Sequence, residues 1–414
     1  MELKPRYKQT ETGVIPVDWD CVHIGDVAET SSGATPPRAK QQEYFDGGTI
    51  PWVKTLDLNN SSILETDECV TPSALQQTSL RLYPSGSVLV AMYGGFNQIG
   101  RTGILTKDAT INQALTAIRP DQSRLSPRFL LNYLNFRVEY WKSVASSSRK
   151  DPNITGRDVR EFPIPLPPLI EQEAAGEALQ DIQDQILMLN ELIAKKRGLK
   201  QAVMQELLTG KRRLPGFEGE WEVKRLGDFA ECTSGGTPTT GVSAYWGGPI
   251  RWMSSGELHL KRVTEVSGRI TPAGLENSSA KLLPPRCVLV GLAGQGKTRG
   301  TAAMNLVELS TNQSIAAVLP NSSFIPEYLY HSLDARYEEL RELSSGSGGR
   351  GGLNLSLIKS LHLPMPIPEE QAAISTTLSD MELELNKVES KITKMRELKQ
   401  GMLQQLLTGK IRLQ

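Results

Sequence analysis

Two long segments of the chain carry hydrophobic residues at alternating steps of three and four, the spacing of a coiled-coil seam. The first runs from about Glu171 to Leu208, and its seam is Leu179, Ile182, Ile186, Leu189 and Ile193. The second has the seam Leu378, Met381, Leu385, Val388 and Ile392. Three lysines, Lys196, Lys200 and Lys399, also fall on seam positions. The pattern predicts two long helices packed on each other; the alternative is that each packs separately on its own domain.

A β-rich stretch precedes each long helix. Short hydrophobic and β-branched runs alternate there with Gly, Ser, Thr and Asn, which is typical of strands joined by turns. SVLVAM at 87–92 and CVLVGL at 287–292 are examples. Helices are expected inside these stretches from Pro127 to Tyr140 and from Pro326 to Leu343. A proline-rich run then closes each stretch, so each predicts a domain that ends where a long helix begins.

The chain is an internal duplication with an offset of about 200 residues. Trp19 in WDCVHIGDVAETSSGATP matches Trp221 in WEVKRLGDFAECTSGGTP. Asn112-Gln113 matches Asn312-Gln313, and both long helices end in Leu-Leu-Thr-Gly-Lys. The glycines of these last motifs, Gly210 and Gly409, suit a left-handed helix C-cap. The repeat is too long for a solenoid and indicates two copies of a domain followed by a helix.

The repeat predicts an α+β fold with pseudo-two-fold symmetry, in which two β-rich domains are separated by two long antiparallel coiled-coil helices. The expected parts are a first domain with the N-terminal segment, 1–168, a first helix, 169–211, a second domain, 212–368, and a second helix, 369–414. If the second helix packs on the first, it runs back toward the first domain. The end of the chain then lies near its beginning.

Composition limits the choice of function. Lys plus Arg number 46 and Asp plus Glu number 46, so the net charge is zero. Free-standing nucleic-acid binders are usually basic, which leaves a DNA reader whose partners supply much of the phosphate contact, or a scaffold that reads nothing.

Other residues exclude several classes of site. The four cysteines, Cys21, Cys69, Cys232 and Cys287, form no C-x-x-C pair, which argues against zinc and fits a reducing cytoplasm. The four histidines are scattered, so no metal site is expected. No signal peptide and no apolar run of about 20 residues stands out, so we expect a cytoplasmic protein with no membrane contact. Methyltransferase, H-E-x-x-H and G-x-S-x-G motifs are also missing, which indicates a non-catalytic chain.

An ordered set of landmarks resembles a known family. The first domain opens with GVIPVDW at 13–19, and the two helices begin with PLPPLIEQ at 165–172 and PIPEEQ at 366–371. With the LLTGK endings, this order resembles the specificity (S) subunit of type I restriction-modification systems along essentially the whole chain. No single motif would suffice for the resemblance; the ordered set carries it.

The resemblance implies a division of labour in phage defence. Each β-rich domain would be a target-recognition domain that binds one half of a bipartite, asymmetric double-stranded DNA target. The helices would set the spacer and dock two methyltransferase (M) subunits, joined by restriction (R) subunits where these are present. This chain would hold no cofactor; S-adenosylmethionine, ATP and Mg²⁺ would belong to partner subunits. A helix of about 38 residues, roughly 57 Å long, can span the 34–36 Å that separates equivalent groove faces of a duplex.

One motif favours a different class. GLAGQGKT at Gly291–Thr298 matches the P-loop pattern after a strand-like run, so an ATPase is the alternative. A P-loop lysine must open a helix. Arg299-Gly300-Thr301 follows here, which is poor helix material, and the matching run AMYGGFNQIGRTG lacks Gly-Lys-Thr.

The two glycine-rich loops are the first candidates for DNA contact. Arg can pair with guanine and Asn or Gln with adenine, while Lys and Thr suit phosphate. The candidates are Asn97, Gln98 and Arg101 in the first domain and Gln295, Lys297, Thr298 and Arg299 in the second. Both loops share flexible backbone, amides and a late arginine, Arg101 or Arg299. An ordinary exposed hairpin is the alternative interpretation.

A second pair of loops is small, flexible and basic. Its candidates are Arg149, Lys150 and Arg350, each ahead of an Asn-[Ile/Leu]-[Thr/Ser] element expected to cap a short helix. A plain surface connection is the alternative. Lys54 and Arg251, next to Trp52 and Trp252, are weaker candidates, because core tryptophans with solvated charges explain them equally well.

Overall fold

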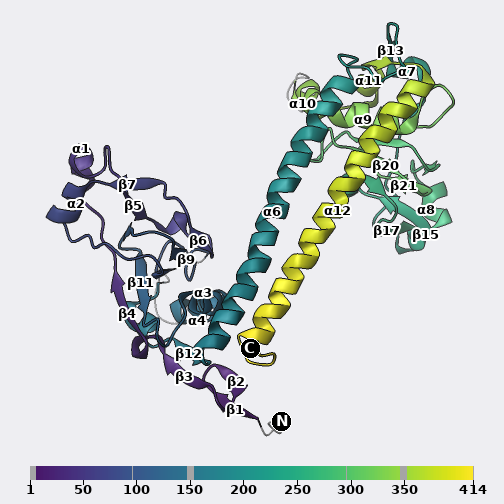
Figure 1. The fold of residues 1–414 in the computed structure, drawn as a ribbon. Helices are drawn as coiled ribbons and strands as arrows, with labels where there is room; N and C mark the ends of the chain where they lie inside the picture. The colour runs from purple at the N-terminus through teal and green to yellow at the C-terminus, as the bar shows by residue number, and fades with distance from the viewer. Residues whose placement is uncertain (1–5, 96, 147–152, 295, 346–351, 414) are drawn as a thin grey trace. The chain divides into compact units, whose positions relative to one another are not determined.

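The computed structural model describes residues 6–95, 97–146, 153–294, 296–345 and 352–413. The chain divides into two compact units, the first made of Met1–Asn190 with Lys391–Gln414 and the second of Glu191–Ser390. Each unit holds one copy of the repeat together with part of each long helix (Figure 1). The expected α+β fold with repeated β-rich domains and two long helices is confirmed. That the four sequence segments are separate domains stays a prediction.

From β3 in the first unit and β13 in the second, the strands follow the same order, except that an isolated bridge at Tyr83 takes the place of β18 in the first unit. Those of the first are β1 (Tyr7–Thr10), β2 (Gly13–Pro16), β3 (Asp20–His23), β4 (Ala28–Ser32), β5 (Ile50–Val53), β6 (Ser62–Ile63), β7 (Glu68–Val70), β8 (Val88–Ala91), β9 (Thr102–Leu105), β10 (Thr110–Ile111), β11 (Leu115–Pro120) and β12 (Pro163–Leu166). Those of the second are β13 (Glu222–Arg225), β14 (Cys232–Ser234), β15 (Trp246–Met253), β16 (Arg262–Val263), β17 (Gly268–Ile270), β18 (Leu282–Leu283), β19 (Val288–Gly291), β20 (Ala302–Asn305), β21 (Leu309–Thr311), β22 (Ile315–Val318) and β23 (His362–Met365).

Helices connect and cover these strands. The first copy has α1 (Gln41–Tyr44), α2 (Pro72–Gln77), α3 (Pro127–Phe136), α4 (Val138–Ser146) and α5 (Gly156–Arg160), and the second has α7 (Leu226–Phe229), α8 (Pro272–Glu276), α9 (Pro326–Ala335), α10 (Tyr337–Ser345) and α11 (Leu355–Lys359). Short 3-10 turns occur at Ile24–Asp26, Arg38–Lys40, Thr55–Asp57, Ser243–Tyr245 and Ser255–Leu260. The long helices are α6 (Leu169–Leu207) and α12 (Pro368–Leu406), each an unbroken ribbon of 39 residues (Figure 1).

A mixed five-stranded sheet forms the centre of each domain. Its order is β4-β11-β8-β9-β6 in the first and β14-β22-β19-β20-β16 in the second. Alternate residues of the central strand point to opposite faces: Val88 and Val90 pack with Phe129 of α3, whereas Leu89 packs with the outer part of the domain. Both faces are therefore buried, which explains the continuous hydrophobic runs seen in the sequence.

The helical stretches expected at 127–140 and 326–343 are present. Each is broken into two, α3 with α4 and α9 with α10, at Arg137 and Arg336. These residues leave helical geometry, at φ −101°, ψ 23° and φ −96°, ψ 21°. Their side chains donate to the carbonyls of Thr12 and His362, at 3.1 and 2.8 Å. Because of the break, α4 and α10 pack against the hairpin loops, while α3 and α9 pack on the sheet. Contacts between distant segments impose this break, and the helical periodicity of the sequence does not predict it.

The long helices pack on each other in antiparallel fashion, as predicted. In the first unit, Leu179 near the start of α6 shares a core with Leu403 near the end of α12. In the second unit, Leu207 at the end of α6 shares a core with Ile374 and Leu378 near the start of α12. The predicted seam residues are buried or half-buried throughout, at Leu179, Ile182, Ile186, Leu189, Ile193, Leu378, Met381, Leu385, Val388 and Ile392.

The seam lysines are paired with side chains of the facing helix. Lys196 Nζ lies 2.6 Å from a Glu384 carboxylate oxygen, and Lys200 Nζ lies 3.7 Å from Glu382. In the first unit Lys399 donates to the Gln183 side chain at 2.7 Å. Lysine stems cover the seam while the ammonium groups find partners, so these positions do not interrupt the packing.

The end of each long helix is tied to the beginning of the other. In the first unit, Arg412 Nε donates to Glu171 at 2.9 Å, and its Nη2 donates to Asp18 at 2.7 Å. Gly409 takes the left-handed conformation at φ 67°, and a Cβ there would come within 2.5 Å of Pro16. The expected return of the chain end to its beginning is thus confirmed inside the first unit.

The second unit repeats this arrangement. Arg213 Nε and Nη2 donate to the two oxygens of Glu370 at 2.6 and 2.7 Å, and Glu370 is fully buried. Trp221 Nε1 donates to the same carboxylate at 3.0 Å. Gly210 is also left-handed, at φ 71°. We call the Arg412–Glu171 and Arg213–Glu370 pairs the closing pairs.

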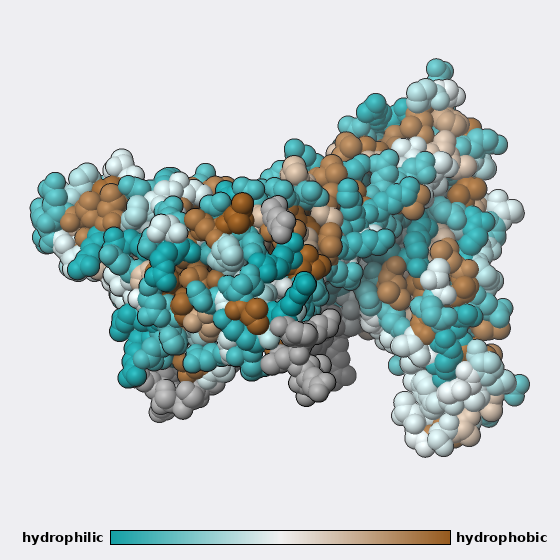
Figure 2. Space-filling view, turned by 60° about the horizontal axis from the view of Figure 1, so that its bottom comes forward, coloured by the Kyte–Doolittle hydropathy of each residue, from teal (hydrophilic) through white to brown (hydrophobic). Residues whose placement is uncertain are grey.

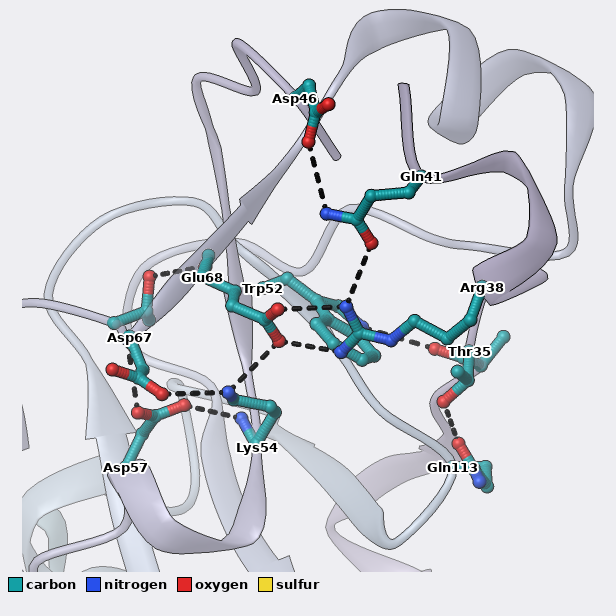
Figure 3. A network of polar contacts seen from close by, with 12 residues as sticks. Thr35, Arg38, Gln41, Asp46, Trp52, Lys54, Asp57, Asp67, Glu68 and Gln113 are labelled. Carbon is teal, nitrogen blue, oxygen red and sulfur yellow. Dashed lines mark hydrogen bonds and ion pairs between the residues drawn. The ribbon is translucent and has the colours of Figure 1, made fainter. Parts of the chain in front are cut away.

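Polar residues in the outer part of the first domain surround Arg38 (Figure 3). Its guanidinium donates to both oxygens of Glu68, at 2.8 and 2.7 Å, and lies 4.3 Å from the ring centroid of Phe45 and 5.2 Å from that of Trp52. Lys54 donates to the same carboxylate at 3.0 Å. Above all through the Arg38 hydrogen bonds, these cations lower the pKa of Glu68 to about 2.

We expect the buried seam to stabilise the second unit. Leu378 on α12 is 0% exposed, whereas Leu383, one turn further on, is 53% exposed. Leu378→Ala should lower the free energy of unfolding by about 2–5 kcal/mol, because it removes buried contacts and leaves a cavity, whereas Leu383→Ala should change it by less than about 0.5 kcal/mol. Urea unfolding followed by circular dichroism measures both; equal losses would contradict the assigned seam.

Glu68 should make the stability of the first unit depend on pH. Its pKa lies below the ordinary 4.5 in the folded state, so its stabilisation is complete above pH 4.5 and is lost as the pH falls toward about 2. Glu68→Gln should therefore lower the urea midpoint at neutral pH, and the difference from the unmodified chain should shrink in acid. The exposed Glu65→Gln is the control; a difference for Glu68→Gln that is constant between pH 5 and about 2 would argue against the network.

Candidate nucleic-acid interface

The two glycine-rich candidate loops have the same backbone conformation at two pairs of equivalent glycines. They join β8 to β9 and β19 to β20 in antiparallel hairpins. Gly94 and Gly294 take φ 125° and 132°, and Gly100 and Gly300 take φ 76° and 79°. The amides of the last two donate to the carbonyls of Ala91 and Gly291, at 3.0 and 2.9 Å. The duplication therefore extends into the loops residue by residue, at an offset of 200.

In this register the late arginines of the two loops occupy different positions. Arg101 corresponds to Thr301, and Arg299 corresponds to Ile99, which is 1% exposed and packs in the core. Arg299 is half-buried, and its Nη1 donates to Ser344 of α10 at 3.3 Å. The glycines with positive φ set the register.

The P-loop alternative is contradicted. After Lys297 the described chain makes turns and enters β20, and no helix follows. The Gly296 carbonyl accepts from Arg341 Nη1 at 2.7 Å, and the Lys297 carbonyl accepts from Tyr337 Oη at 3.3 Å. A phosphate cradle needs amide donors at a helix N-terminus. In this loop carbonyls face the neighbouring helix α10 instead.

The two predicted loops of each domain begin or end side by side. The Ile154 amide, just after the second loop, donates to the carbonyl of Met92 at 3.0 Å. In the second domain the Leu353 amide donates to the Leu292 carbonyl at 3.1 Å. Arg149, Lys150, Gln295 and Arg350 lie outside the described residues. The candidate interface of each domain is thus the hairpin tip together with the adjoining chain.

The short helices after these loops are capped as expected. The Asn354 side chain accepts from the Leu357 amide at 2.9 Å and caps α11. In the first domain Thr155, rather than Asn153, caps α5, with Asp158 completing a capping box.

Among the described candidates, two side chains are exposed at the hairpin tips. They are Asn97 and Lys297, which occupy equivalent positions. Gln98, Arg101 and Thr298 are half-buried. The same backbone therefore presents an amide in one domain and a cation in the other, so the two loops offer different hydrogen-bond chemistry to a ligand.

Sequence reasoning missed the contribution of α10. In the second domain Arg341, Glu338 and Glu342 line a surface depression with Gly294, Gly296, Arg299 and Ser344. The clue was Gly300, where a Cβ would come within 3.3 Å of Leu340 and of the Tyr337 carbonyl. The depression combines carboxylates with guanidinium groups, so it is not a simple anion site.

The weaker candidates are engaged elsewhere. Lys54 is bound to Asp67 and Glu68 (Figure 3), and Arg251 lies 3.3 Å from Glu265. Trp52 is buried in the core, and Trp252 Nε1 donates to the Gly236 carbonyl at 2.9 Å. The tryptophans are therefore structural, and the neighbouring charges are paired within the protein.

The residues that the structure describes offer no candidate metal centre. They contain no group of three or more His, Cys, Asp or Glu side chains placed to hold a metal. Cys232 and Cys287 are unpaired, and burial raises their thiol pKa values to about 11 and about 12, far from the reactive range. No helix in the described ranges is both long and apolar enough to cross a membrane. Figure 2 shows a mainly hydrophilic face on which hydrophobic residues form separate groups.

Solved structures share the fold. The S subunit of a type I restriction-modification system from M. genitalium aligns with a TM-score of 0.64, covering 98% of this chain and 99% of that one at 14% identity. A chain from a structural study of complex assembly and conformational transition in the type I R-M system aligns with a TM-score of 0.58, covering 96% and 99% at 19% identity. At such identities the likeness shows the fold alone.

Curated relatives of similar sequence are specificity subunits of type I restriction enzymes. The type I restriction enzyme MjaIX specificity subunit of Methanocaldococcus jannaschii is 26% identical over 344 residues, 78% of this chain and 77% of the relative. The EcoR124I/EcoR124II specificity subunit of Escherichia coli is 25% identical over 276 residues, 64% of this chain and 67% of the relative.

A family model for the type I restriction modification DNA specificity domain matches the chain twice, at residues 16–195 and 218–395. Each match covers one copy of the repeat, from the residues before its tryptophan into its long helix. The chain therefore belongs to the type I restriction-modification DNA specificity family.

Proposed function

We propose that this chain is the DNA-reading subunit of a type I restriction-modification complex. Each of its two domains reads one half of a bipartite, asymmetric target in double-stranded DNA. The long helices set the spacer between the halves and dock two M subunits. R subunits join where the system also cleaves DNA.

The observation that carries this proposal is the contrast between identical scaffolds and different loop tips. The hairpins share backbone conformation and register, yet equivalent tip positions hold Asn97 and Lys297. Amides pair with adenine, whereas lysine suits phosphate, which positions a duplex without specifying a base. Two domains with the same fold but different loop-tip side chains suit a DNA target whose two halves differ in sequence.

The repeat of the helices supports the docking of two identical partners. The closing pairs and the helix seam recur in both units, so each unit offers equivalent helix ends. Closed assemblies use such repeated surfaces for identical subunits. In this proposal the chain is not catalytic: M subunits bring S-adenosylmethionine and methylate adenine, and R subunits bring ATP and Mg²⁺.

Zero net charge favours one other candidate, a scaffold that joins partners without reading DNA. Footprinting of the assembled complex separates the two. Protection at one split sequence supports a reader, and protection independent of sequence supports the scaffold.

The methylome of cells that express the chain with its M subunit tests the proposal directly. We expect one new split motif. Inserting four residues into α6, about one helical turn, should change the spacer and leave both half-sites unchanged, because the domains read separately. No new motif, or a changed half-site, would count against the proposal.

Lys297 gives a test of the candidate loop. In the complex, Lys297→Ala should weaken binding to all duplexes about equally, and should reduce the slope of log K against log salt by about 1, because one phosphate contact is lost. Lys224→Ala is the matched control, since Lys224 lies on β13 and pairs with Glu222 at 2.6 Å. Titrations of labelled duplex at several salt concentrations measure the slope; equal slopes for both variants would exclude this contact.

A further inference from the structure

A half-buried group of charged side chains joins the second domain to the long helices within the second unit. Arg262 stands on β16, the edge strand of the five-stranded sheet. Its Nε and Nη2 both donate to Oε2 of Glu382 on α12, at 3.3 and 3.1 Å. Tyr330 of α9 donates to Oε1 of the same carboxylate at 3.2 Å. Lys200 of α6 lies 3.7 Å from it. The sheet edge and three helices thus meet at one carboxylate.

The surroundings make Glu382 the shared partner of two cations. The Arg262 guanidinium lies 4.1 Å from the ring centroid of Tyr330, which holds its plane in position. His331 next to it is fully buried, and burial, followed by the charges of Arg262 and Lys200, lowers its pKa to about 3. The imidazole is therefore neutral and adds no third charge to the group.

The first unit has no counterpart of this group. The residues equivalent to Arg262, Tyr330 and Glu382 in the repeat are Ser62, Leu131 and Gln183. Lys399, equivalent to Lys200, donates to Gln183 at 2.7 Å, so the two helices are still bridged there. Among the described residues, no hydrogen bond or ion pair links Ser62 or Leu131 to a long helix.

Both domains are hydrogen-bonded to a glutamine at the start of a long helix, Gln172 or Gln371, but the charged group at Glu382 is an additional link that belongs to the second domain. In the first unit Leu131 is buried, and Gly176 lets α3 approach α6 so closely that a Cβ would lie 3.2 Å from that of Arg128. Apolar contact is non-directional and tolerates small shifts. Hydrogen bonds to a charged carboxylate are directional, and a shift that breaks them leaves half-buried charges without a partner.

We propose that Arg262, Tyr330 and Glu382 form an orientation clamp that fixes the angle of the second domain on its helix ends and so restricts the spacer lengths that the complex accepts. The clamp residues are positioning residues and need not touch DNA. The effect on spacer length rests on the proposed function of a reader of split targets.

Variants that copy the other half of the repeat test the clamp. Arg262→Ser and Glu382→Gln place in the second unit the residues that the first unit already carries, and Tyr330→Phe removes only the hydroxyl. The full chain is assembled with its M subunit. Methylation rates are then measured on duplexes with the native spacer and with spacers one base pair shorter or longer.

Arg262→Ser removes two hydrogen bonds to Glu382, and Glu382→Gln removes the charge that accepts them. We expect each to raise the rate on altered spacers, relative to the native one, by at least about tenfold, because the loss of one hydrogen bond to a charged group already corresponds to that factor. Tyr330→Phe should have a smaller effect, and Arg262→Lys should lie between Arg262→Ser and the unmodified chain. Amide hydrogen exchange at β16 should also quicken, with β19 unchanged as the mark of an intact fold. Gln183→Ala is the matched control in the first unit and should leave the spacer profile as it is.

The outcomes separate the two proposals. A split motif with an unchanged spacer profile in all clamp variants overturns the clamp and leaves the reader intact, as does equal broadening by Gln183→Ala. Absence of any split motif with the unmodified chain overturns both.

Discussion

The structure depends on an ion pair between a buried glutamate and a partly exposed arginine, which occurs once in each unit. Each long helix begins with a buried glutamate, and the arginine that holds it comes from beyond the end of the other helix, as in Arg412–Glu171 and Arg213–Glu370. Next to it, the Gln172 and Gln371 side chains accept from domain amides at 2.8 and 2.9 Å. A buried carboxylate is costly without its cation. In each unit the carboxylate comes from one long helix and the cation from beyond the end of the other, so each unit needs both helices.

This mutual closure explains why the two copies agree where they do. The prolines, the Glu-Gln pair and the Leu-Leu-Thr-Gly ending all serve helix ends, and a change in one copy would leave a partner in the other segment unsatisfied. Residues away from the helix ends carry no such constraint. There the central strands and the loop glycines still agree, but the copies differ at exposed tips and supports, as at Asn97 and Lys297 or at Ser62 and Arg262. The two copies thus share the residues that build the common framework, and they differ at the hairpin tips and at the residues that support each domain on the helices.

The framework could be predicted because periodic and repeated sequence patterns encode it. The spacing of the seam residues predicted the long helices, and the offset of about 200 residues predicted the two β-rich domains. Sequence reasoning could not place the break at Arg137, which tertiary packing imposes, or the register of Arg299, which depends on backbone φ at the glycines. The clamp at Glu382 was also beyond reach, since Arg262, Tyr330 and Glu382 are far apart in sequence and only folding brings them to one point.

The charges of the chain also make sense in this light. Many of its cations are already committed to internal carboxylates, at the closing pairs, the helix seam, the clamp and the network around Glu68. Cations held in this way give little attraction to a phosphate backbone, and a net charge of zero adds none at long range. Under the proposed function, a chain built like this would discriminate between bases with a few loop residues and would draw most of its affinity for DNA from partner subunits. Selectivity and affinity would then be carried by different polypeptides.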